Sequence, residues 1–183
     1  IEMKEEGFHV IAPATSYETR FVLFTTGAGS LTPRKFSFLP EHPRVHYHLT
    51  HKEQFKDQRL LVLGGGDSAL DIASQLQTIS PQVTLMHRRR EFRGLESTQS
   101  TLTDHVTMKI PYLIETVQAK DNAIEIQSVH NETQQKETAT YDHVFVAYGF
   151  EADTQQWQDV PLERIQQKLA VSSKMETSMR GVY

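Results

Sequence analysis

The sequence predicts an α/β fold built on a doubly wound parallel sheet. The first observation is a continuous apolar run at 60–63, typical of a strand buried on both faces, which three glycines follow at 64–66. The second is a set of apolar residues that recurs at helical spacing from 69 to 76. The third is another strand-like run at 83–86. Strand, helix and strand in this order are typical of a βαβ unit with parallel strands.

The turn between the first strand and the helix fits the G-x-G-x-x-G/A fingerprint of Rossmann-like dinucleotide-binding domains. Gly64 suits the tight turn, Gly66 lets a pyrophosphate approach the backbone, and Ala69 lets the helix pack close to the strand. N–H groups of the first helical turn then face the phosphates, and we expect Asp67 to cap the helix because its charge would repel them. The cofactor-binding residues predicted here are Gly64, Gly65, Gly66, Asp67, Ser68 and Ala69.

The segment that follows the second strand is strongly basic. It reads His87-Arg88-Arg89-Arg90-Glu91-Phe92-Arg93. Dinucleotide sites selective for NAD place Asp or Glu here, where the carboxylate accepts hydrogen bonds from the ribose hydroxyls. Guanidinium groups instead suit the geometry and charge of a 2′-phosphate. We therefore expect NADPH as the cofactor, with its 2′-phosphate on Arg88, Arg89 and Arg93 and with His87 alongside; the alternative is a solvated basic turn.

The rest of this domain is predicted to be β-structure. Strands are expected at 107–110, 112–118, 123–130, 136–141 and 144–147. The three from 112 to 141 alternate apolar and polar residues, which predicts an antiparallel β-meander, whereas 144–147 is apolar throughout and predicts a buried parallel strand. Gly149 follows the end of that last strand, where ligands bind in such sheets, so we predict that its backbone approaches the nicotinamide half. The alternative is an ordinary glycine at the end of a strand.

Four segments resemble thioredoxin reductase-like flavoproteins. The strings GGGDSALDIASQL and VTLMHRRREFRGLE, between 64 and 96, are close to the family's NADPH-domain pattern GGGDSAxxxA…VTLxHRRDxFRA. Residues 141–150, 19–29 and 172–182 are similar to the family's strand before the return crossover, its T-G motif between domains and its segment before the last flavin contact. The resemblance implies a FAD-dependent oxidoreductase in which NADPH passes a hydride to FAD.

The cysteine count separates two subgroups of this family. Thioredoxin reductases carry a C-x-x-C pair shortly before the glycine turn, whereas the stretch 45–57 has no cysteine and neither has the whole chain. A dithiol is required to pass electrons to a disulfide, so this activity is excluded for the chain. The stretch 45–57, with GAGSLTPRK at 27–35 and YGF at 148–150, instead resembles the homodimeric ferredoxin–NADP+ reductases. Arg90 replaces the usual Asp of the family, and we expect it to enlarge the basic cluster.

The resemblance also implies a domain organisation. Residues 1–50 are expected to be a remnant of a FAD-binding domain and hinge, with strands at 8–11 and 20–24. Residues 51–150 are expected to form the NADPH-binding domain, and 151–183 a return segment toward the FAD-binding domain. Because the chain has no starting methionine and the family's own FAD fingerprint lies upstream, we expect a fragment that binds NADPH without holding FAD and is inactive alone.

Charge and composition limit the other functions. The net charge of −4 argues against nucleic-acid binding, and no apolar run approaches the roughly 20 residues of a membrane span. We expect a cytoplasmic enzyme whose partners are NADPH and, through FAD, ferredoxin or flavodoxin, and which is a homodimer when intact. No catalytic residue is expected, since the flavin itself accepts the hydride.

The sequence also admits three other interpretations. One is a zinc or nickel site, which could begin with four histidines that lie close together in the sequence, His42, His46, His48 and His51. Histidines that are solvated or packed in a hinge are the better account, so no metal is expected. The protein could instead be another cysteine-free, NADPH-dependent flavin oxidoreductase, or a non-catalytic NADPH-sensing module.

Overall fold

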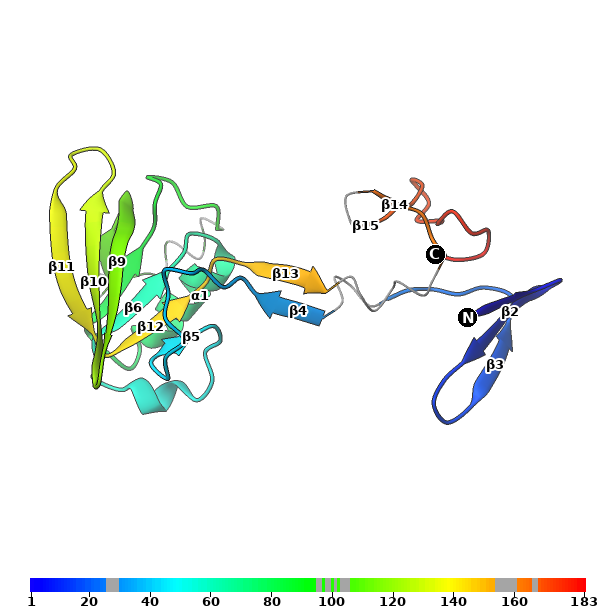
Figure 1. Ribbon diagram of the computed structural model, residues 1–183, viewed down its shortest axis with the longest axis horizontal. Coiled ribbons are helices and arrows are strands. Elements are labelled where there is room, and N and C mark those ends of the chain that lie inside the picture. The colour runs from blue at the N-terminus through cyan, green and yellow to red at the C-terminus, as the bar shows by residue number, and fades with distance from the viewer. Residues whose placement is uncertain are drawn as a thin grey trace. The chain divides into compact units, whose positions relative to one another are not determined.

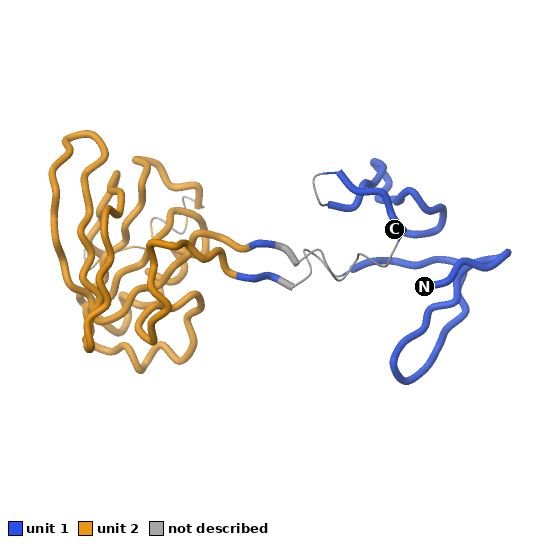
Figure 2. Tube along the Cα trace, in the orientation of Figure 1, with its two compact units in different colours: residues 1–32, 151–183 blue, residues 33–150 orange. Residues whose placement is uncertain are grey.

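The computed structural model describes residues 1–25, 30–94, 97, 100, 102, 106–153, 161–165 and 168–183. The chain divides into a larger unit of residues 33–150 and a smaller unit of residues 1–32 and 151–183 (Figure 2). The larger unit begins before the expected residue 51, because the short strand β5 (Val45–His46) pairs with β12 (His143–Val146) inside it. The glycines of the 27–35 motif lie outside the described residues.

The larger unit is built around a five-stranded sheet in the order β5-β12-β6-β7-β8 (Figure 1). The other strands are β6 (Leu60–Leu63), β7 (Val83–Met86) and β8 (Val106–Lys109), and every neighbouring pair is parallel. Leu63 lies beside Met86 on one side and Val146 on the other, so the carboxyl ends of β12, β6 and β7 meet at one edge. The glycines and the basic segment both follow this edge.

The two faces of this sheet have different covers. One face carries the helix α1 (Asp67–Leu76), whose buried residues pack with Leu60, Val62 and Phe145. On the other face, Leu61 and Leu63 pack with residues of a three-stranded antiparallel sheet. That sheet comprises β9 (Tyr112–Lys120), β10 (Ala123–His130) and β11 (Lys136–Tyr141). Successive residues of β6 therefore serve opposite faces, which explains why the whole strand is apolar.

The predicted α/β class, with its parallel sheet and antiparallel meander, is confirmed. A doubly wound arrangement is not seen among the described residues, because the meander occupies the face where a second layer of helices would pack. The strands at 123–130 and 136–141 begin and end where the alternation predicts, and those expected at 107–110 and 144–147 each lie one residue earlier. A short 3₁₀ helix, η1 (Lys52–Phe55), precedes β6.

The smaller unit is made of short strands. β1 (Glu2–Lys4), β2 (Gly7–Ile11) and β3 (Ser16–Thr19) form an antiparallel sheet, and β14 (Arg164–Ile165) pairs with β15 (Lys168–Leu169). β4 (Ser30–Pro33) pairs with β13 (Phe150–Asp153), and Pro33 and Phe150 are already assigned to the larger unit. Among the described residues, no helix is long and apolar enough to cross a membrane.

The strand expected at 20–24 is wrong. The chain turns back at Ala12, whose N–H donates to the Thr15 carbonyl (2.8 Å), so β3 takes the place beside β2. Residues 20–24 lie outside the named strands, although Val22 forms an isolated bridge with Val182 and the backbone of 22–24 hydrogen-bonds to 181–183. The side chains of Phe21 and Leu23 are exposed. The apolar character of 20–24 was therefore not enough to predict where this strand lies.

Candidate nucleotide-binding site

Gly64 begins the glycine turn, residues 64–66, and its backbone requires glycine. Its φ of +149° is one that L-residues rarely adopt. A Cβ at this position would lie 2.5 Å from the carbonyl oxygen of Ala147 and 2.9 Å from the Cβ of Ala69. Ala69 is fully buried, so helix, turn and β12 approach one another as closely as the fingerprint predicts.

Gly66 differs from Gly64 because no protein atom requires a glycine there. Its backbone is extended (φ −105°), and a Cβ built on it would meet no heavy atom within 4 Å. The open space lies at the amino terminus of α1, where helical N–H groups and the helix dipole favour an anion. The site therefore has room for a phosphate close to the backbone.

The N-cap of the helix lies one residue earlier than predicted. Gly66 is the N-cap, and its carbonyl accepts hydrogen bonds from the N–H groups of Ala69 (3.0 Å) and Leu70 (3.2 Å). Asp67 lies in the first turn and is exposed, as Ser68 is, so the expectation that Asp67 caps the helix is wrong. A carboxylate in the first turn still interacts favourably with the helix dipole.

The basic loop, residues 87–93, lies against the glycine turn. The N–H of Arg93 donates to the carbonyl of Gly65 (2.7 Å). A Cβ on Gly65 would lie 2.4 Å from the imidazole of His87, so the ring covers this glycine closely. The structure therefore brings together the two segments that the sequence assigned to the pyrophosphate and the 2′-phosphate.

His87 is a buried, neutral ring rather than an exposed cation. Its side chain stacks on Phe92, with ring centroids 5.5 Å apart, and in the described part of the chain its buried Nε2 has no hydrogen-bond partner. Burial lowers the pKa of His87, and the positive charges of Arg88, Arg89 and Arg93 lower it further, although a hydrogen bond with the Glu91 backbone acts in the opposite direction. The ring therefore shapes the site and leaves the charge to the arginines.

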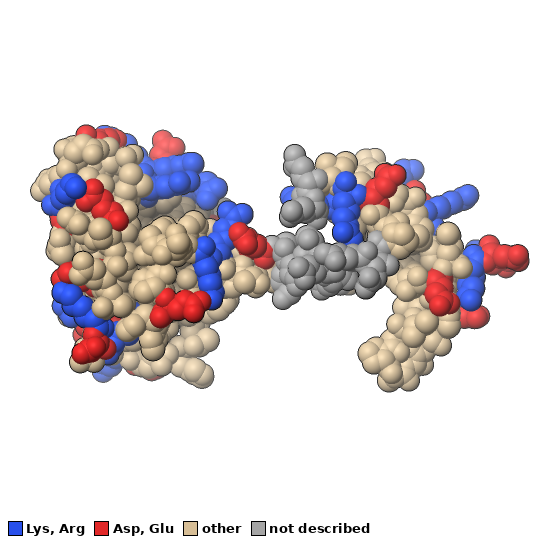
Figure 3. Space-filling model, viewed as in Figure 1, with Lys and Arg blue, Asp and Glu red and all other residues tan. Residues whose placement is uncertain are grey.

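Arg90 does not enlarge the free basic cluster, contrary to expectation. Its Nε donates to Oε1 of Glu132 (2.5 Å) and its Nη2 donates to Oε2 of the same carboxylate. Arg88, Arg89 and Arg93 are exposed, and none of them has an ion-pair partner among the residues that the structure describes. Figure 3 shows a group of Lys and Arg side chains at the upper edge of the larger unit.

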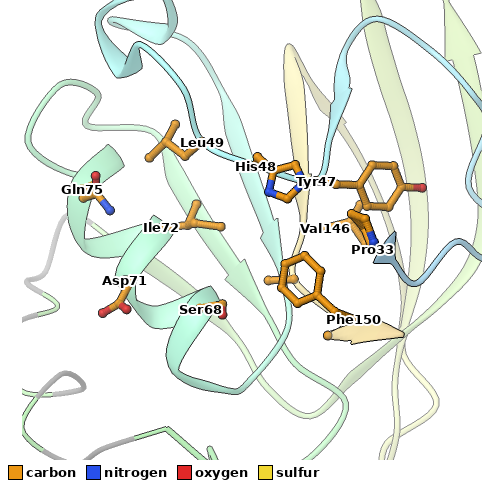
Figure 4. A pocket seen from close by; sticks show the side chains of 12 residues that line it. Pro33, Tyr47, His48, Leu49, Ser68, Asp71, Ile72, Gln75, Val146 and Phe150 are labelled. Atoms are coloured by element: carbon orange, nitrogen blue, oxygen red, sulfur yellow. The ribbon is translucent and has the colours of Figure 1, made fainter. Parts of the chain in front are cut away.

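A cavity of about 280 Å³ lies at the same edge of the sheet, between α1 and the segments after β5 and β12 (Figure 4). Ser68, Asp71 and Gln75 line it from the helix, and His48, Gly149 and Phe150 line it from the opposite side. The rings of His48 and Phe150 are stacked, with centroids 5.8 Å apart. Gly149 has a φ of +91°, and a Cβ there would meet no heavy atom within 4 Å, so the backbone conformation is what favours glycine. Ser68 thus belongs to both the helix start and the cavity.

Several residues of this cavity were not identified from the sequence. One signal was present: four residues of the helix follow the i, i+3, i+4, i+7 pattern of a single helix face, namely Ser68, Asp71, Ile72 and Gln75. His48 and Phe150 gave no comparable signal, because only the parallel pairing of β5 with β12 brings their segments together.

The histidines at 42–51 do not gather in one place. Nε2 of His46 lies 2.8 Å from Nδ1 of His143, a residue of β12, and the His46 ring contacts Phe55 and Phe145. His48 instead lines the cavity. In the described ranges, no group of three or more His, Cys, Asp or Glu side chains is placed to hold a metal ion.

The chain is similar to ferredoxin–NADP reductases of bacteria. It is 35% identical over 191 residues to that of Lacticaseibacillus paracasei and 33% identical over 186 residues to that of Acholeplasma laidlawii. Each match covers 100% of this chain and 58% of the relative, so the chain spans a little over half the length of these proteins.

Solved structures of thioredoxin reductases share the fold. The enzyme of T. acidophilum matches with a TM-score of 0.80 at 18% identity, and that of Lactococcus lactis with a TM-score of 0.76 at 20% identity. Both matches cover 100% of this chain and 62% of the solved chain. The family model described as pyridine nucleotide-disulphide oxidoreductase matches residues 1–183. The resemblance seen in the sequence is thereby confirmed, and the chain belongs to the pyridine nucleotide-disulphide oxidoreductase family.

Proposed function

We propose that this chain is the NADPH-binding part of a FAD-dependent ferredoxin–NADP+ reductase. The observation that carries the proposal is the contact between the glycine turn and the basic loop, through the Arg93 N–H and the Gly65 carbonyl. It supports a site in which the open space beside Gly66, at the start of α1, lies close to the loop that carries Arg88, Arg89 and Arg93, three cations with no ion-pair partner in the described ranges. A solvated basic turn would not need to be attached to the glycine turn in this way.

In this proposal, three places among the described residues bind the three parts of the dinucleotide. Gly65, Gly66 and Ser68 face the pyrophosphate, and Arg88, Arg89 and Arg93 hold the 2′-phosphate. The cavity beside Gly149 receives the nicotinamide half, because Ser68 lies between it and the glycine turn. When bound, NADPH supplies a hydride for the flavin of the intact protein. The chain's own residues bind and orient the nucleotide, and none of them acts as an acid or a base.

The acceptor proposed is ferredoxin or flavodoxin. The names of the similar proteins support ferredoxin, and the absence of cysteine from the sequence argues against a disulfide substrate. By the same resemblance we propose a homodimer, and the lack of cysteine fits a cytoplasmic protein. The acceptor is tested with the full-length protein loaded with FAD, by comparing NADPH-dependent reduction of ferredoxin, flavodoxin and a small disulfide. Equal rates with all three would contradict the assignment.

The cofactor is tested by calorimetric titration of the chain with NADP+ and NAD+ in phosphate-free buffer of low ionic strength. We expect a preference for NADP+ that falls about tenfold in Arg88→Ala, since one exposed charge-assisted hydrogen bond is lost. Arg20→Ala, which removes an exposed arginine from the smaller unit, is the matched control and should leave the preference unchanged. Equal binding of both nucleotides by the unaltered chain would remove the 2′-phosphate site from the proposal.

A further inference from the structure

The basic loop carries a fourth arginine whose charge is already neutralised. Arg90 meets Glu132 through two parallel hydrogen bonds, from Nε to Oε1 and from Nη2 to Oε2. This arrangement of guanidinium and carboxylate fixes orientation as well as charge. Arg90 holds the pKa of Glu132 below its usual value, so the carboxylate stays ionised.

Glu132 lies in a well-held turn between β10 and β11. The neighbouring Asn131 N–H donates to the carbonyl of Pro111 (2.8 Å), and Nδ1 of His130 accepts from the N–H groups of Glu132 (3.3 Å) and Thr133 (3.1 Å). The His130 ring in turn packs edge-on against Tyr112. The carboxylate is therefore presented by a structured hairpin tip rather than by a loose loop.

The basic loop is fastened at both ends by its backbone. The His87 N–H donates to the Lys109 carbonyl (3.0 Å), the His87 carbonyl accepts from the Tyr112 N–H (2.9 Å), and the Arg93 N–H donates to Gly65. Between these ends, the Arg90–Glu132 pair joins a side chain of the loop to one of the meander's β10–β11 turn. Arg88 and Arg89 immediately precede it.

We propose that Arg90 is a positioning residue that determines coenzyme preference by masking Glu132. This inference rests on the proposed NADPH site. With Arg90 in place, the carboxylate is neutralised and Arg88, Arg89 and Arg93 set the local field. Without Arg90, an ionised Glu132 would lie beside the loop that receives the 2′-phosphate, and like charges repel. Sites selective for NAD use a carboxylate in this region to reject that phosphate.

The proposal predicts opposite effects for the two partners. Arg90→Ala exposes the carboxylate, so NADP+ affinity falls about fivefold while NAD+ affinity stays within about twofold, because only NADP+ carries the extra phosphate. Glu132→Gln removes the negative charge and frees Arg90, so NADP+ affinity is unchanged or higher. In the double variant, Arg90→Ala with Glu132→Gln, most of the NADP+ affinity returns. A pair that merely stiffens the loop would give equal losses for both single variants and for both nucleotides.

The experiment is calorimetric titration of the 183-residue chain and its variants with NADP+ and with NAD+, at 50 mM and 500 mM NaCl. If Arg90 acts by charge masking, the loss of NADP+ affinity in Arg90→Ala becomes smaller at high salt, because the repulsion between Glu132 and the 2′-phosphate acts across solvent. Circular dichroism confirms that each variant is folded, which is expected because both side chains are exposed.

The outcomes separate this inference from the proposed function. If the unaltered chain does not prefer NADP+, or if Arg88→Ala does not reduce the preference, the 2′-phosphate site itself fails. If Arg88→Ala reduces the preference but Arg90→Ala does not, or if Glu132→Gln is as harmful as Arg90→Ala, only the masking role is overturned. Recovery of NADP+ affinity in the double variant supports it.

Discussion

At the scale of single residues, two glycines of one turn have different physical reasons to be glycine. Gly64 has a positive φ, and a side chain there would collide with the backbone of Ala147. Gly66 has an extended backbone that any residue can adopt, and the space around it is open. The first glycine therefore serves the fold, whereas the second leaves room for a ligand.

Alanine at each position should separate these roles. Gly64→Ala is expected to destabilise the chain by about 2–3 kcal/mol, through backbone strain and the contact with Ala147, and to lower the midpoint of urea unfolding. Gly66→Ala is expected to change stability by less than about 0.5 kcal/mol. It should nevertheless weaken the binding of NADP+ and of NAD+ alike, about tenfold or more, because the added Cβ occupies the space proposed for the pyrophosphate. Urea denaturation and calorimetry measure the two effects. Unchanged binding in Gly66→Ala would remove the pyrophosphate from this turn.

At the scale of elements, the edge strand β5 is joined to β12 by a pair of histidines. His46 and His143 are 2.8 Å apart through ring nitrogens, so one ring donates and the other accepts, and the accepting ring must be neutral. Burial lowers the pKa of His143 to about 4, and His46 and Arg44 contribute to the shift. Burial also lowers the pKa of His46. Both shifts favour the neutral form of the rings, and protonation of both would break the hydrogen bond.

The histidine pair predicts a loss of stability in mild acid. The pKa of His143 in the folded chain lies below the value of about 6.5 expected when unfolded, so the unfolded chain binds more protons between pH 6.5 and 4. The stabilisation is complete above pH 6.5 and falls through this window. His143 should contribute about 1–2 kcal/mol to the loss, after allowance for its partial exposure.

Urea unfolding of the chain and of His143→Asn, at intervals from pH 7.5 to pH 4.5, measures this effect. The variant should show a shallower decline, since one of the groups that titrates differently in the two states is gone. The carboxylates of Asp142 and Glu137, whose pKa values Arg59 and Lys109 lower, lose their contribution at still lower pH and do not confuse the comparison. Identical slopes for the two proteins would refute the role of the pair.

At the scale of the whole molecule, the candidate site belongs to one unit. The glycine turn, the basic loop and the cavity beside Gly149 all lie within residues 33–150. That unit has its own apolar cores on both faces of the parallel sheet. The smaller unit has a separate core around Phe8, Leu162 and Val182.

Residues 33–150 should therefore fold and bind alone. We expect the isolated segment to unfold cooperatively and to bind NADP+ within about threefold of the full chain's affinity, since no residue of the proposed site is removed. Thermal unfolding by circular dichroism and calorimetric titration are the measurements, with Arg88→Ala in the same segment as a control for specific binding. A folded segment with no NADP+ preference would show that the smaller unit contributes to the site.

Most of the parallel core could be predicted from the sequence, because strands buried on both faces leave continuous apolar runs and the glycine turn has a fixed chemistry. The meander was predictable because its strands alternate. The strand at Ser16–Thr19 was not, since it is short and largely exposed and its position depends on a turn at Ala12. The Arg90–Glu132 and His46–His143 contacts join residues 42 and 97 positions apart, and no local pattern reveals such partners. What escaped prediction were pairings that only the folded chain creates.

The hairpin that shields one side of the sheet ends beside the loop proposed to choose the coenzyme. The length of this hairpin therefore sets the position of Glu132. A change of one or two residues at its tip would move Glu132 away from Arg90 without altering any residue proposed to contact the nucleotide. Coenzyme choice in this chain could then drift during evolution, or be redesigned, from a turn more than 40 positions away in the sequence. A survey of variants that considers only the nucleotide-facing loop would overlook it.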